Sequence, residues 1–376
     1  MTIILYGLPH SLYTGKTRAY LRKQGLVYEE RAPSHPHFQN VVLPAIGRGI
    51  IPVVVLEDGT IIQDTVDILD HFEEQGVRCT ARPPASLQRV LAHIAELYAV
   101  TTLTRHAMHY RWSYFDEQAA FLTHAFAIGS GPEAAAKIMG RMQSYLPALG
   151  VTERTIPVIE KSFEMLIQHL NAHFEALPYL FGAQPSIGDY GLFGPLFAHL
   201  GRDPVPEAIM KAKAPSLYRW VERMNAPDAD IPEYPDMPAG YHDNESLPAT
   251  LTPIFKQMGE ELFPELSDKL EGLKAIVESR DPQPGEPVTE KPHQRLIGTV
   301  HTSFRGVACE IGLQPYGFFL WARVVDAWKE AQAGEQNAIL NYLTDTGLAP
   351  LLTNPLPIRF ERRNHLEVWG ERSEAL

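Results

Sequence analysis

Residues 50–73 read IIPVVVLEDGTIIQDTVDILDHFE. Two runs of β-branched residues flank the dipeptide Asp58-Gly59, which is the strongest short-range signal for a β-hairpin. The second half of the stretch repeats apolar residues at helical spacing, and three of them share one helix face: Val66, Leu69 and Phe72. The stretch therefore predicts a β-hairpin followed directly by an amphipathic helix.

The residues before this stretch predict a strand, a helix and another strand. TIILY, from Thr2, has the apolar character of a buried strand, TGKTRAYLRKQG has the pattern of a helix that ends at Gly25, and LVYEERA has that of a second strand. FQNVVLPAIG, from Phe38, predicts a short irregular helix. A βαβ unit followed by a β-hairpin and a helix is the order of elements in a thioredoxin-like fold.

The remainder of the chain changes character several times. A Pro-rich linker over 76–86 precedes helical patterns that continue to about residue 226, an extended connection follows over 226–248, and one further helix is predicted over 249–279. Strand and helix patterns are mixed at the C-terminus. We therefore expect three units, which are a thioredoxin-like α/β domain over 1–79, an all-α domain over 86–280 and a small α+β extension over 290–376.

Three segments of the extension carry its predicted elements. RLIGTVHTSFRGVACEIGL predicts paired strands, PYGFFLWARVVDAWKEA predicts a helix opened by a proline, and PIRFERRNHLEVWG predicts a final strand or strand pair. The helix has aromatic residues that must be buried, and Arg323 is expected to pair within that interface. The segment has no recognisable catalytic signature, so we interpret these residues as core.

Composition excludes several classes of function. The chain has 33 Lys and Arg against 45 Asp and Glu, a net charge of −12, which repels phosphate backbones, so nucleic acid is not an expected partner. No run approaches the roughly 18 apolar residues of a membrane span, and the N-terminus lacks a secretory signal pattern, so we expect a cytoplasmic protein that does not enter membranes. Cys79 and Cys309 are far apart, and neither a disulfide framework nor a metal site is expected.

Residues 2–21, TIILYGLPHSLYTGKTRAYL, contain two overlapping motifs. Gly15-Lys16-Thr17 is similar to the end of a phosphate-binding loop, but the glycine that such a loop needs five residues earlier is His10. Ser11 begins the predicted helix, where N–H groups and the helix dipole stabilise an anion. Its hydroxyl can donate a hydrogen bond to a bound thiolate, or its oxygen can simply cap the helix.

Taken together, these features resemble a glutathione transferase. The shared motifs of the N-terminal part are Ile51-Pro52 before a strand, the Asp58-Gly59 hairpin and the pair Asp64-Thr65 at the start of the next helix. In the helical part, QPSIGDYGLFGPL is similar to the family's capping box, here Ser186 and Asp189, whose role is structural. The resemblance covers about residues 1–226.

The resemblance implies a glutathione site in the N-terminal domain. Pro52 would be a cis-proline, and the backbone of Ile51 would pair with the cysteinyl part of glutathione. Gln63, Asp64 and Thr65 would hold the γ-glutamyl end. His37 falls where the family often places a side chain near the glycyl carboxylate, although a solvated loop also explains His35 and His37. The same two explanations apply to Arg48.

The activity implied is attack of glutathione, as co-substrate, on a small, largely apolar electrophile. Ser11 is the first choice for stabilising the thiolate and Tyr13 the reserve, whereas Tyr6 is interpreted as core. Tyr110 and Arg111 are the best guesses for the electrophile site, among aromatic and basic residues that also fit a helix core. The resemblance implies a homodimer. A non-catalytic binding protein of the same fold and a glutathione-dependent isomerase or lyase remain as alternatives.

Overall fold

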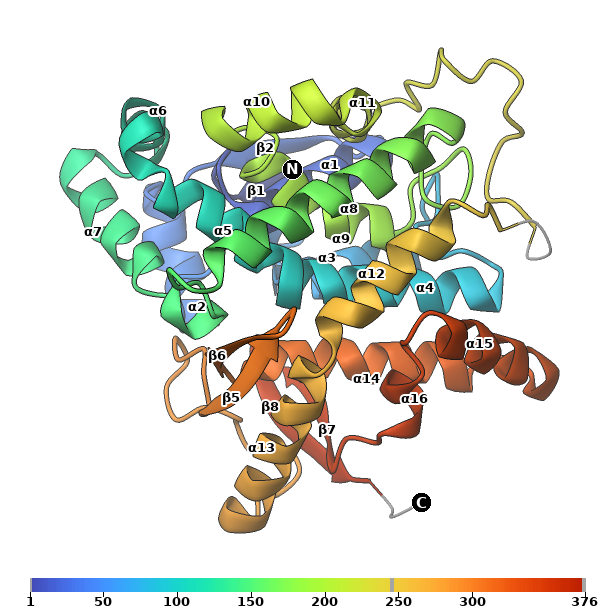
Figure 1. The fold of residues 1–376 in the computed structure, drawn as a ribbon. Helices are drawn as coiled ribbons and strands as arrows, with labels where there is room; N and C mark the ends of the chain where they lie inside the picture. Colours follow the sequence, from blue (N-terminus) through green and yellow to red (C-terminus); the bar gives the residue numbers. More distant parts are fainter. Residues whose placement is uncertain (1, 244–246, 374–376) are drawn as a thin grey trace.

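The N-terminal domain is built on a four-stranded sheet (Figure 1). The computed structural model describes residues 2–243 and 247–373. The strand order is β2-β1-β3-β4, with β1 parallel to β2 and antiparallel to β3, and β3 antiparallel to β4. The strands are β1 (Ile3–Tyr6), β2 (Tyr28–Arg31), β3 (Val53–Val55) and β4 (Ile61–Gln63). The thioredoxin-like arrangement predicted from the sequence is confirmed.

Helices cover both faces of this sheet. They are α1 (Leu12–Lys23), η1 (Phe38–Val42), α2 (Leu43–Ile46) and α3 (Thr65–Gln75). Successive strand residues point to opposite faces, so the strands supply two separate cores. Leu5 and Val54 belong to the core shared with α1 and α3, whereas Tyr6 and Val53 belong to a smaller core with Phe38 of η1.

The second domain, over residues 86–225, consists of helices joined by short connections. Its helices are α4 (Ser86–Tyr98), η2 (Ala99–Leu103), α5 (Thr104–Ser113), α6 (Phe115–Ala127), α7 (Pro132–Gln143), η3 (Pro147–Leu149), α8 (Ile156–Ala176), α9 (Ile187–Ala198), α10 (Pro204–Lys213) and α11 (Pro215–Asn225). The predicted capping box begins α9, because Ser186 Oγ accepts from Asp189 N (3.3 Å) and the Asp189 carboxylate accepts from Ser186 N (2.8 Å). The backbone of Gly191 passes so close to α4 that a Cβ there would lie 2.8 Å from Glu96 Cα.

The single helix predicted over 249–279 is wrong. Two helices replace it, α12 (Leu251–Leu262) and α13 (Glu265–Arg280). Pro264 lies between them, and Phe263 before it is extended, with φ −114° and ψ 138°. Proline lacks the N–H that a helix interior needs and disfavours helical backbone in the preceding residue, so the helix ends there.

The C-terminal extension has the predicted mixture of strands and helices. Its elements are β5 (Thr299–Phe304), β6 (Val307–Gly312), α14 (Pro315–Lys329), α15 (Ala333–Asp345), α16 (Pro350–Thr353), β7 (Ile358–Arg363) and β8 (Leu366–Arg372). β5 pairs with β6 and β7 with β8, both antiparallel. The turn residues between β7 and β8, Asn364 and His365, both have positive φ, as a tight hairpin turn requires.

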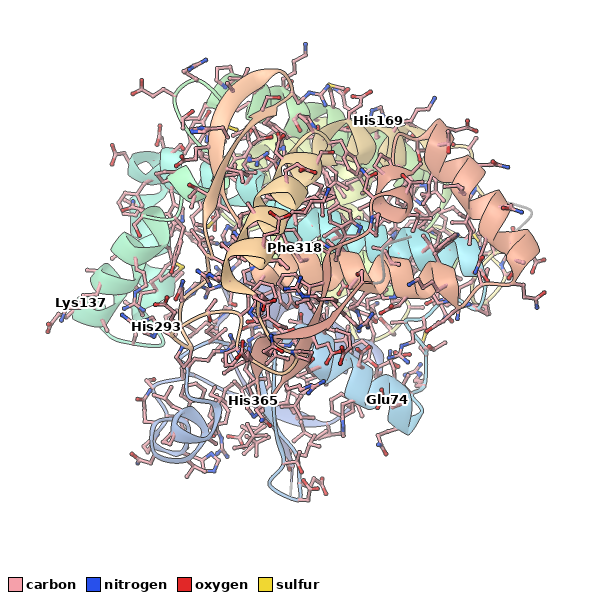
Figure 2. The ribbon with its side chains drawn as sticks, turned by 90° about the horizontal axis from the view of Figure 1, so that it is seen from below. Glu74, Lys137, His169, His293, Phe318 and His365 are labelled. Atoms are coloured by element: carbon pink, nitrogen blue, oxygen red, sulfur yellow. The ribbon has the colours of Figure 1, made fainter. Side chains whose placement is uncertain are left out.

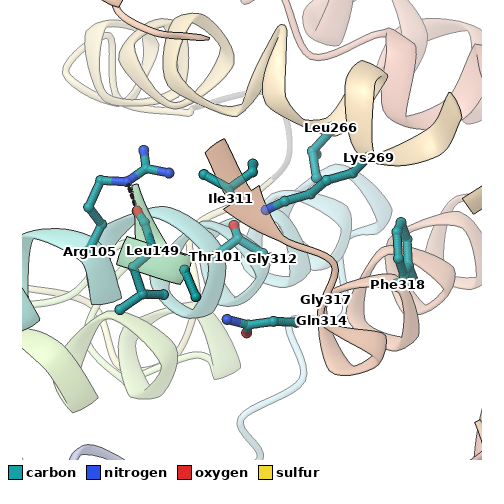
Figure 3. Close-up of a pocket in the computed structure, with 11 residues that line it drawn as sticks. Thr101, Arg105, Leu149, Leu266, Lys269, Ile311, Gly312, Gln314, Gly317 and Phe318 are labelled. Atoms are coloured by element: carbon teal, nitrogen blue, oxygen red, sulfur yellow. Dashed lines mark hydrogen bonds between the residues drawn. The ribbon is translucent and has the colours of Figure 1, made fainter. Parts of the chain in front are cut away.

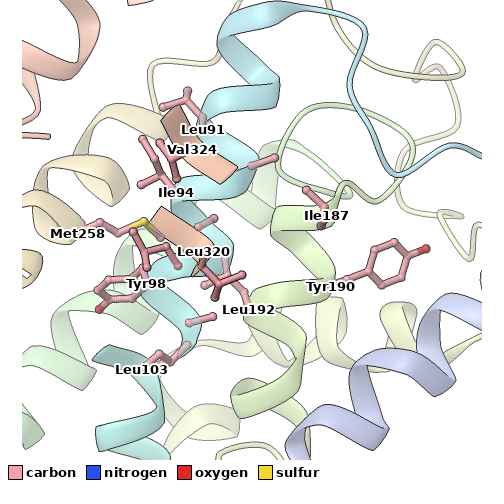
Figure 4. Close-up of a cluster of buried hydrophobic side chains, with 14 of the residues drawn as sticks. Leu91, Ile94, Tyr98, Leu103, Ile187, Tyr190, Leu192, Met258, Leu320 and Val324 are labelled. Atoms are coloured by element: carbon pink, nitrogen blue, oxygen red, sulfur yellow. The ribbon is translucent and has the colours of Figure 1, made fainter. Parts of the chain in front are cut away.

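The extension shares its core with the rest of the protein. Helix α14 lies along α4, and Figure 4 shows Leu320 and Val324 of α14 beside Leu91 and Ile94 of α4, with Met258 of α12 next to them. All five side chains are fully buried. Residues from all three parts form one continuous apolar cluster, so the extension is a structural part of the molecule.

None of the helices in 2–243 and 247–373 is long and apolar enough to cross a membrane. In the same part of the chain, no three His, Cys, Asp or Glu side chains are grouped so that they would hold a metal ion.

Candidate functional site

Five predicted site residues lie at one end of the β3–β4 hairpin: Ile51, Pro52, Gln63, Asp64 and Thr65. The Ile51-Pro52 peptide bond is cis, as the resemblance implied. Pairing of Val53 with Gln63 brings the two segments side by side, and Asp64 N donates to Pro52 O (3.3 Å). The loop before β3 and the start of α3 therefore form one surface.

Asp64 and Thr65 open α3. Asp64 has a positive φ of 91°, and its carboxylate caps the helix by accepting from Val66 N (3.0 Å). Thr65 is 1 % exposed, and its Oγ1 has no hydrogen-bond partner among the described residues. A buried hydroxyl without a partner costs about 1–3 kcal/mol. A ligand carboxylate that reached this helix N-terminus would meet a free donor and a favourable dipole.

Ser11 is the N-cap residue of α1. Its Oγ accepts from Thr14 N at 3.3 Å, and its backbone is extended. The capping role considered from the sequence is therefore present. Capping uses the oxygen as an acceptor, so the hydroxyl proton of this half-buried side chain is still able to donate to an anion.

Tyr13 lies two residues further along α1. Burial raises the pKa of its hydroxyl to about 12, and Arg295 and Asp64 act on it in opposite directions. Tyr13 is thus protonated at neutral pH and is a donor rather than a base.

His37 contacts Tyr6 instead of the surface formed by Pro52 and Asp64. The Tyr6 hydroxyl and His37 Nδ1 are 2.7 Å apart, and the two rings are stacked at 6.0 Å. Tyr6 is fully buried, which agrees with its interpretation as core. The half-buried His37 therefore has a protein partner, and its predicted contact with a glycyl carboxylate stays a prediction.

Side chains of the extension reach the start of α3. The Tyr316 hydroxyl, from α14, donates to Asp64 Oδ1 at 2.7 Å. Arg362, from β7, donates to Gln63 O (3.3 Å), Gln63 Oε1 (3.1 Å) and Asp67 Oδ2 (3.0 Å). Figure 2 shows the β7–β8 hairpin, with His365 at its turn, against the N-terminal domain. The extension therefore covers the surface predicted to bind glutathione.

Charges alternate across this contact. Arg48, from the loop after α2, donates to Gln63 Oε1 (2.8 Å) and to Glu367 of β8 (3.3 Å), and Glu367 also pairs with Arg362. Burial alone would lower the pKa of Arg362, but neighbouring carboxylates outweigh it and raise that pKa. Burial raises the pKa of Asp67 to about 6, against the opposing effect of Arg362.

Sequence reasoning missed most of this contact. The sequence singles out Arg48, and Arg323 pairs within the interface as expected, because its guanidinium donates to both Asp70 carboxylate oxygens (2.7 and 3.0 Å). Tyr316 and Arg323 are seven residues apart, so they share a helix face, which was the available signal. Arg362 gave none, because a strand of alternating charges is typical of a solvent-exposed hairpin.

Tyr110 and Arg111, the predicted electrophile-binding residues, are both 2 % exposed. Arg111 donates to both carboxylate oxygens of Asp203 (2.6 and 2.8 Å) and to the carbonyls of His10 (3.0 Å) and Ala198 (2.6 Å). These bonds join the loop after β1 to the helical domain, which is a structural role. Neither side chain lines the two cavities described next.

An enclosed cavity of about 20 Å³ lies where α5, α13, β6 and α14 meet (Figure 3). Arg105 and Lys269 contribute to its wall, and Arg105 Nε donates to Leu149 O at 2.6 Å. Glu265 pairs with both cations. This volume holds about one water molecule, so the cavity is too small for an organic substrate.

An open cleft of about 450 Å³ lies beside the loop that joins β1 to α1. Its apolar wall contains Leu8 and Pro9 of that loop, Ile128 between α6 and α7, and Phe197 of α9. Arginines of α1 and β2 form the polar wall. Pockets for small organic ligands have volumes of about 300–1,000 Å³, so the cleft has the size of a substrate site.

Comparisons with known proteins agree with this architecture. The model of the glutathione S-transferase N-terminal domain matches residues 5–77, and that of the C-terminal domain matches residues 143–223. No curated protein matches the chain.

Solved structures that the chain matches include a glutathione S-transferase from Xanthobacter autotrophicus, with 22 % identity over 60 % of this chain and 93 % of that one, and a TM-score of 0.37. A β-etherase from Sphingobium has 18 % identity, over 61 % and 97 %, with a TM-score of 0.42. A glutathione S-transferase of Ceriporiopsis subvermispora in complex with glutathione has 16 % identity, over 60 % and 98 %, with a TM-score of 0.41. Because both domain models match in order along one chain, residues 5–77 and 143–223 belong to the N-terminal and C-terminal domain families of the glutathione S-transferases.

Proposed function

We propose that the protein is a glutathione-dependent transferase. The thiol of glutathione would be held at the N-terminus of α1 and would attack a small, largely apolar electrophile. The observation that carries the proposal is the position of Ser11, a half-buried N-cap residue with a hydroxyl proton able to donate, beside a helix N-terminus. Nucleophilic attack requires the thiolate, which such a donor stabilises.

The magnitude required is within the reach of this arrangement. Lowering the pKa of a thiol by two units takes about 2.7 kcal/mol of preferential stabilisation of the thiolate. A hydrogen bond to a charged group contributes about 1.5–3 kcal/mol, and a helix N-terminus adds about 0.3–1 kcal/mol. Ser11 and the dipole of α1 together supply this amount without a metal ion or a neighbouring base.

Binding of the rest of glutathione would use the surface at the start of α3. The main chain of Ile51, fixed by the cis peptide bond, would pair with the cysteinyl part. The Asp64 carboxylate would accept from the γ-glutamyl ammonium, and the Thr65 hydroxyl, which has no partner among the described residues, would donate to the γ-glutamyl carboxylate. For the electrophile we propose the cleft beside Leu8 and Ile128, because its size and apolar wall fit.

Substitution of Ser11 tests the chemistry. Ser11→Ala removes the donor, and we expect kcat/KM with glutathione and a chromogenic aryl halide to fall at least tenfold, with KM for glutathione little changed. The ultraviolet absorbance of the bound thiolate should titrate at higher pH. Ser11→Thr keeps a hydroxyl and is the matched control. Unchanged turnover in Ser11→Ala would reject Ser11 and leave Tyr13 as the candidate donor.

A second candidate function is supported by the extension. Since Gln63 and Thr65 are each 1 % exposed beneath it, a non-catalytic member of the superfamily that uses the fold for binding also fits. Calorimetry separates the two, because millimolar glutathione that gives neither heat nor a thermal shift excludes the transferase. Turnover without consumption of glutathione would instead indicate an isomerase or lyase.

A further inference from the structure

The extension satisfies the same atoms that a γ-glutamyl group needs. We define the γ-glutamyl subsite as Gln63, Asp64 and Thr65. Its main acceptors are the Asp64 carboxylate and the two oxygens of Gln63, and the extension donates to both residues. The Tyr316 hydroxyl donates to Asp64 Oδ1 (2.7 Å), and Arg362 Nη2 donates to Gln63 O and Oε1 (3.3 and 3.1 Å).

A γ-glutamyl group and the two extension side chains both offer donors to this subsite, but only the γ-glutamyl group also brings a carboxylate. A γ-glutamyl group carries an ammonium, which needs acceptors, and a carboxylate, which needs donors. The Tyr316 hydroxyl and the Arg362 guanidinium are donors and replace the ammonium. Nothing among the described residues replaces the carboxylate, since Thr65 Oγ1 is buried without a partner.

We propose that Tyr316 and Arg362 compete with the γ-glutamyl group for this subsite and so determine whether a γ-glutamyl thiol binds. This inference rests on the proposed function. Asp64 Oδ1 already accepts from Val66 N and Tyr316, and Gln63 Oε1 from Arg48 and Arg362. Each oxygen has two lone pairs, so a γ-glutamyl ammonium reaches these two atoms only when Tyr316 and Arg362 leave them. The apparent affinity is therefore the intrinsic affinity multiplied by the fraction of molecules in which these contacts are open.

The fold allows these contacts to open without release of the whole extension. Phe360 of β7 stacks on Phe318 of α14 at 5.1 Å, and both rings are buried, so the hairpin has an apolar attachment that is independent of the polar contacts. The contacts of Tyr316 and Arg362 with the subsite are polar, and the ion pairs of Arg362 with Asp67 and Glu367 lie at its margin. The competition therefore involves side chains and the tip of the hairpin.

The test uses the full-length chain and three proteins. Tyr316→Phe/Arg362→Met removes the two competing donors and replaces each side chain by one of similar length and shape. Tyr342→Phe/Arg359→Met is the matched control, because it removes a hydroxyl and a guanidinium from α15 and β7 of the same extension, with Arg359 paired to Asp326 instead of the subsite. Calorimetry measures the Kd of glutathione for wild type, variant and control. Near-ultraviolet circular dichroism verifies folding, and Tyr316→Phe alone serves if the double variant does not fold.

We expect the variant to bind glutathione at least tenfold more tightly than wild type and control. In wild type, saturating glutathione should also increase amide hydrogen exchange in β7–β8. Equal Kd values in all three folded proteins would overturn the competition and leave the proposed function intact. Weaker binding by the variant would overturn it as well, because the two residues would then help to hold glutathione. No binding by any of the three would reject glutathione as the ligand, and the competition with it.

Discussion

A buried ion pair connects the first two domains at the residue scale. Lys16 of α1 pairs with Glu96 of α4, and the side chains are 5 % and 1 % exposed. His93 lies 3.6 Å from the other Glu96 oxygen. Burial alone would raise the pKa of Glu96, but Lys16 and His93 outweigh it and hold that pKa at about 2. Lys16, which the sequence placed in an apparent phosphate loop, therefore fastens two domains together.

Removing one partner of this pair should be costly. Glu96→Gln leaves Lys16 buried without a counter-charge, and we expect the free energy of unfolding to fall by about 3–5 kcal/mol at pH 7, measured with urea. Because the pKa of Glu96 is lower in the folded state than the usual 4.5, its contribution is complete above about pH 4.5 and is lost as the pH falls towards 2. The gap between wild type and variant should close over that range.

The exposed pair of Lys137 and Glu133 provides the control. These side chains are 75 % and 89 % exposed, and Glu133→Gln should change stability by less than about 1 kcal/mol. A similar loss in both variants would show that burial of the Lys16–Glu96 pair has no special effect.

At the scale of elements, the close approach of α9 to α4 determines how the helical domain packs. The capping box starts α9 at Ser186, and the two glycines that follow, Gly188 and Gly191, face α4. A Cβ on either would lie within about 3 Å of α4 backbone atoms, 3.0 Å from Ala92 Cα and 2.8 Å from Glu96 Cα. Small residues are required there because neither backbone can move aside easily.

A pair of identical substitutions tests this packing. We expect Gly191→Ala to destabilise the fold by about 1–3 kcal/mol through overpacking against α4. Gly140→Ala in α7, where an added Cβ meets nothing within 4 Å, should instead stabilise it by up to about 1 kcal/mol, since alanine is the better helix former. Thermal and urea unfolding measure both, and the same sign for both changes would refute the packing argument.

At the scale of the whole molecule, the extension is a third layer on the first two domains. Helix α14 covers α4, and polar side chains of α14 and β7 reach α3. These faces of α3 and α4 are already buried within one chain, so a homodimer of the kind that the family resemblance implies would have to use another surface.

Deleting residues 281–376 should destabilise the remaining domains. The deletion exposes Leu91 and Ile94 of α4, which are fully buried in the intact protein. We expect the shortened chain to unfold at lower temperature and to aggregate, as followed by calorimetry and light scattering, because a large apolar surface then faces water. Leu320→Ala in the intact chain should give a milder loss of about 2–5 kcal/mol. A monodisperse shortened chain with the wild-type melting temperature would contradict a shared core.

The elements could be predicted from the sequence because their signals are local. The β-hairpin at Asp58-Gly59, the start of α3 at Asp64 and the capping box of α9 depend on residues within a few positions of each other. The wrong prediction of one helix over 249–279 also concerned a local signal, because Pro264 marks the break between the two helices. Composition and periodicity likewise sufficed for the thioredoxin-like sheet, the helical domain and the mixed extension.

The contacts of Tyr316 and Arg362 with Asp64 and Gln63 could be found only in the folded protein. Tyr316 meets Asp64 across 252 residues of chain, and Arg362 meets Gln63 across 299. Such contacts depend on how α14 packs against α4, which no local pattern specifies. The burial of Arg111 and Tyr110 was hidden for the same reason, because a helix sequence shows which residues share a face but not what that face contacts. Local sequence thus set the elements and the resemblance, and long-range packing set the access to the site.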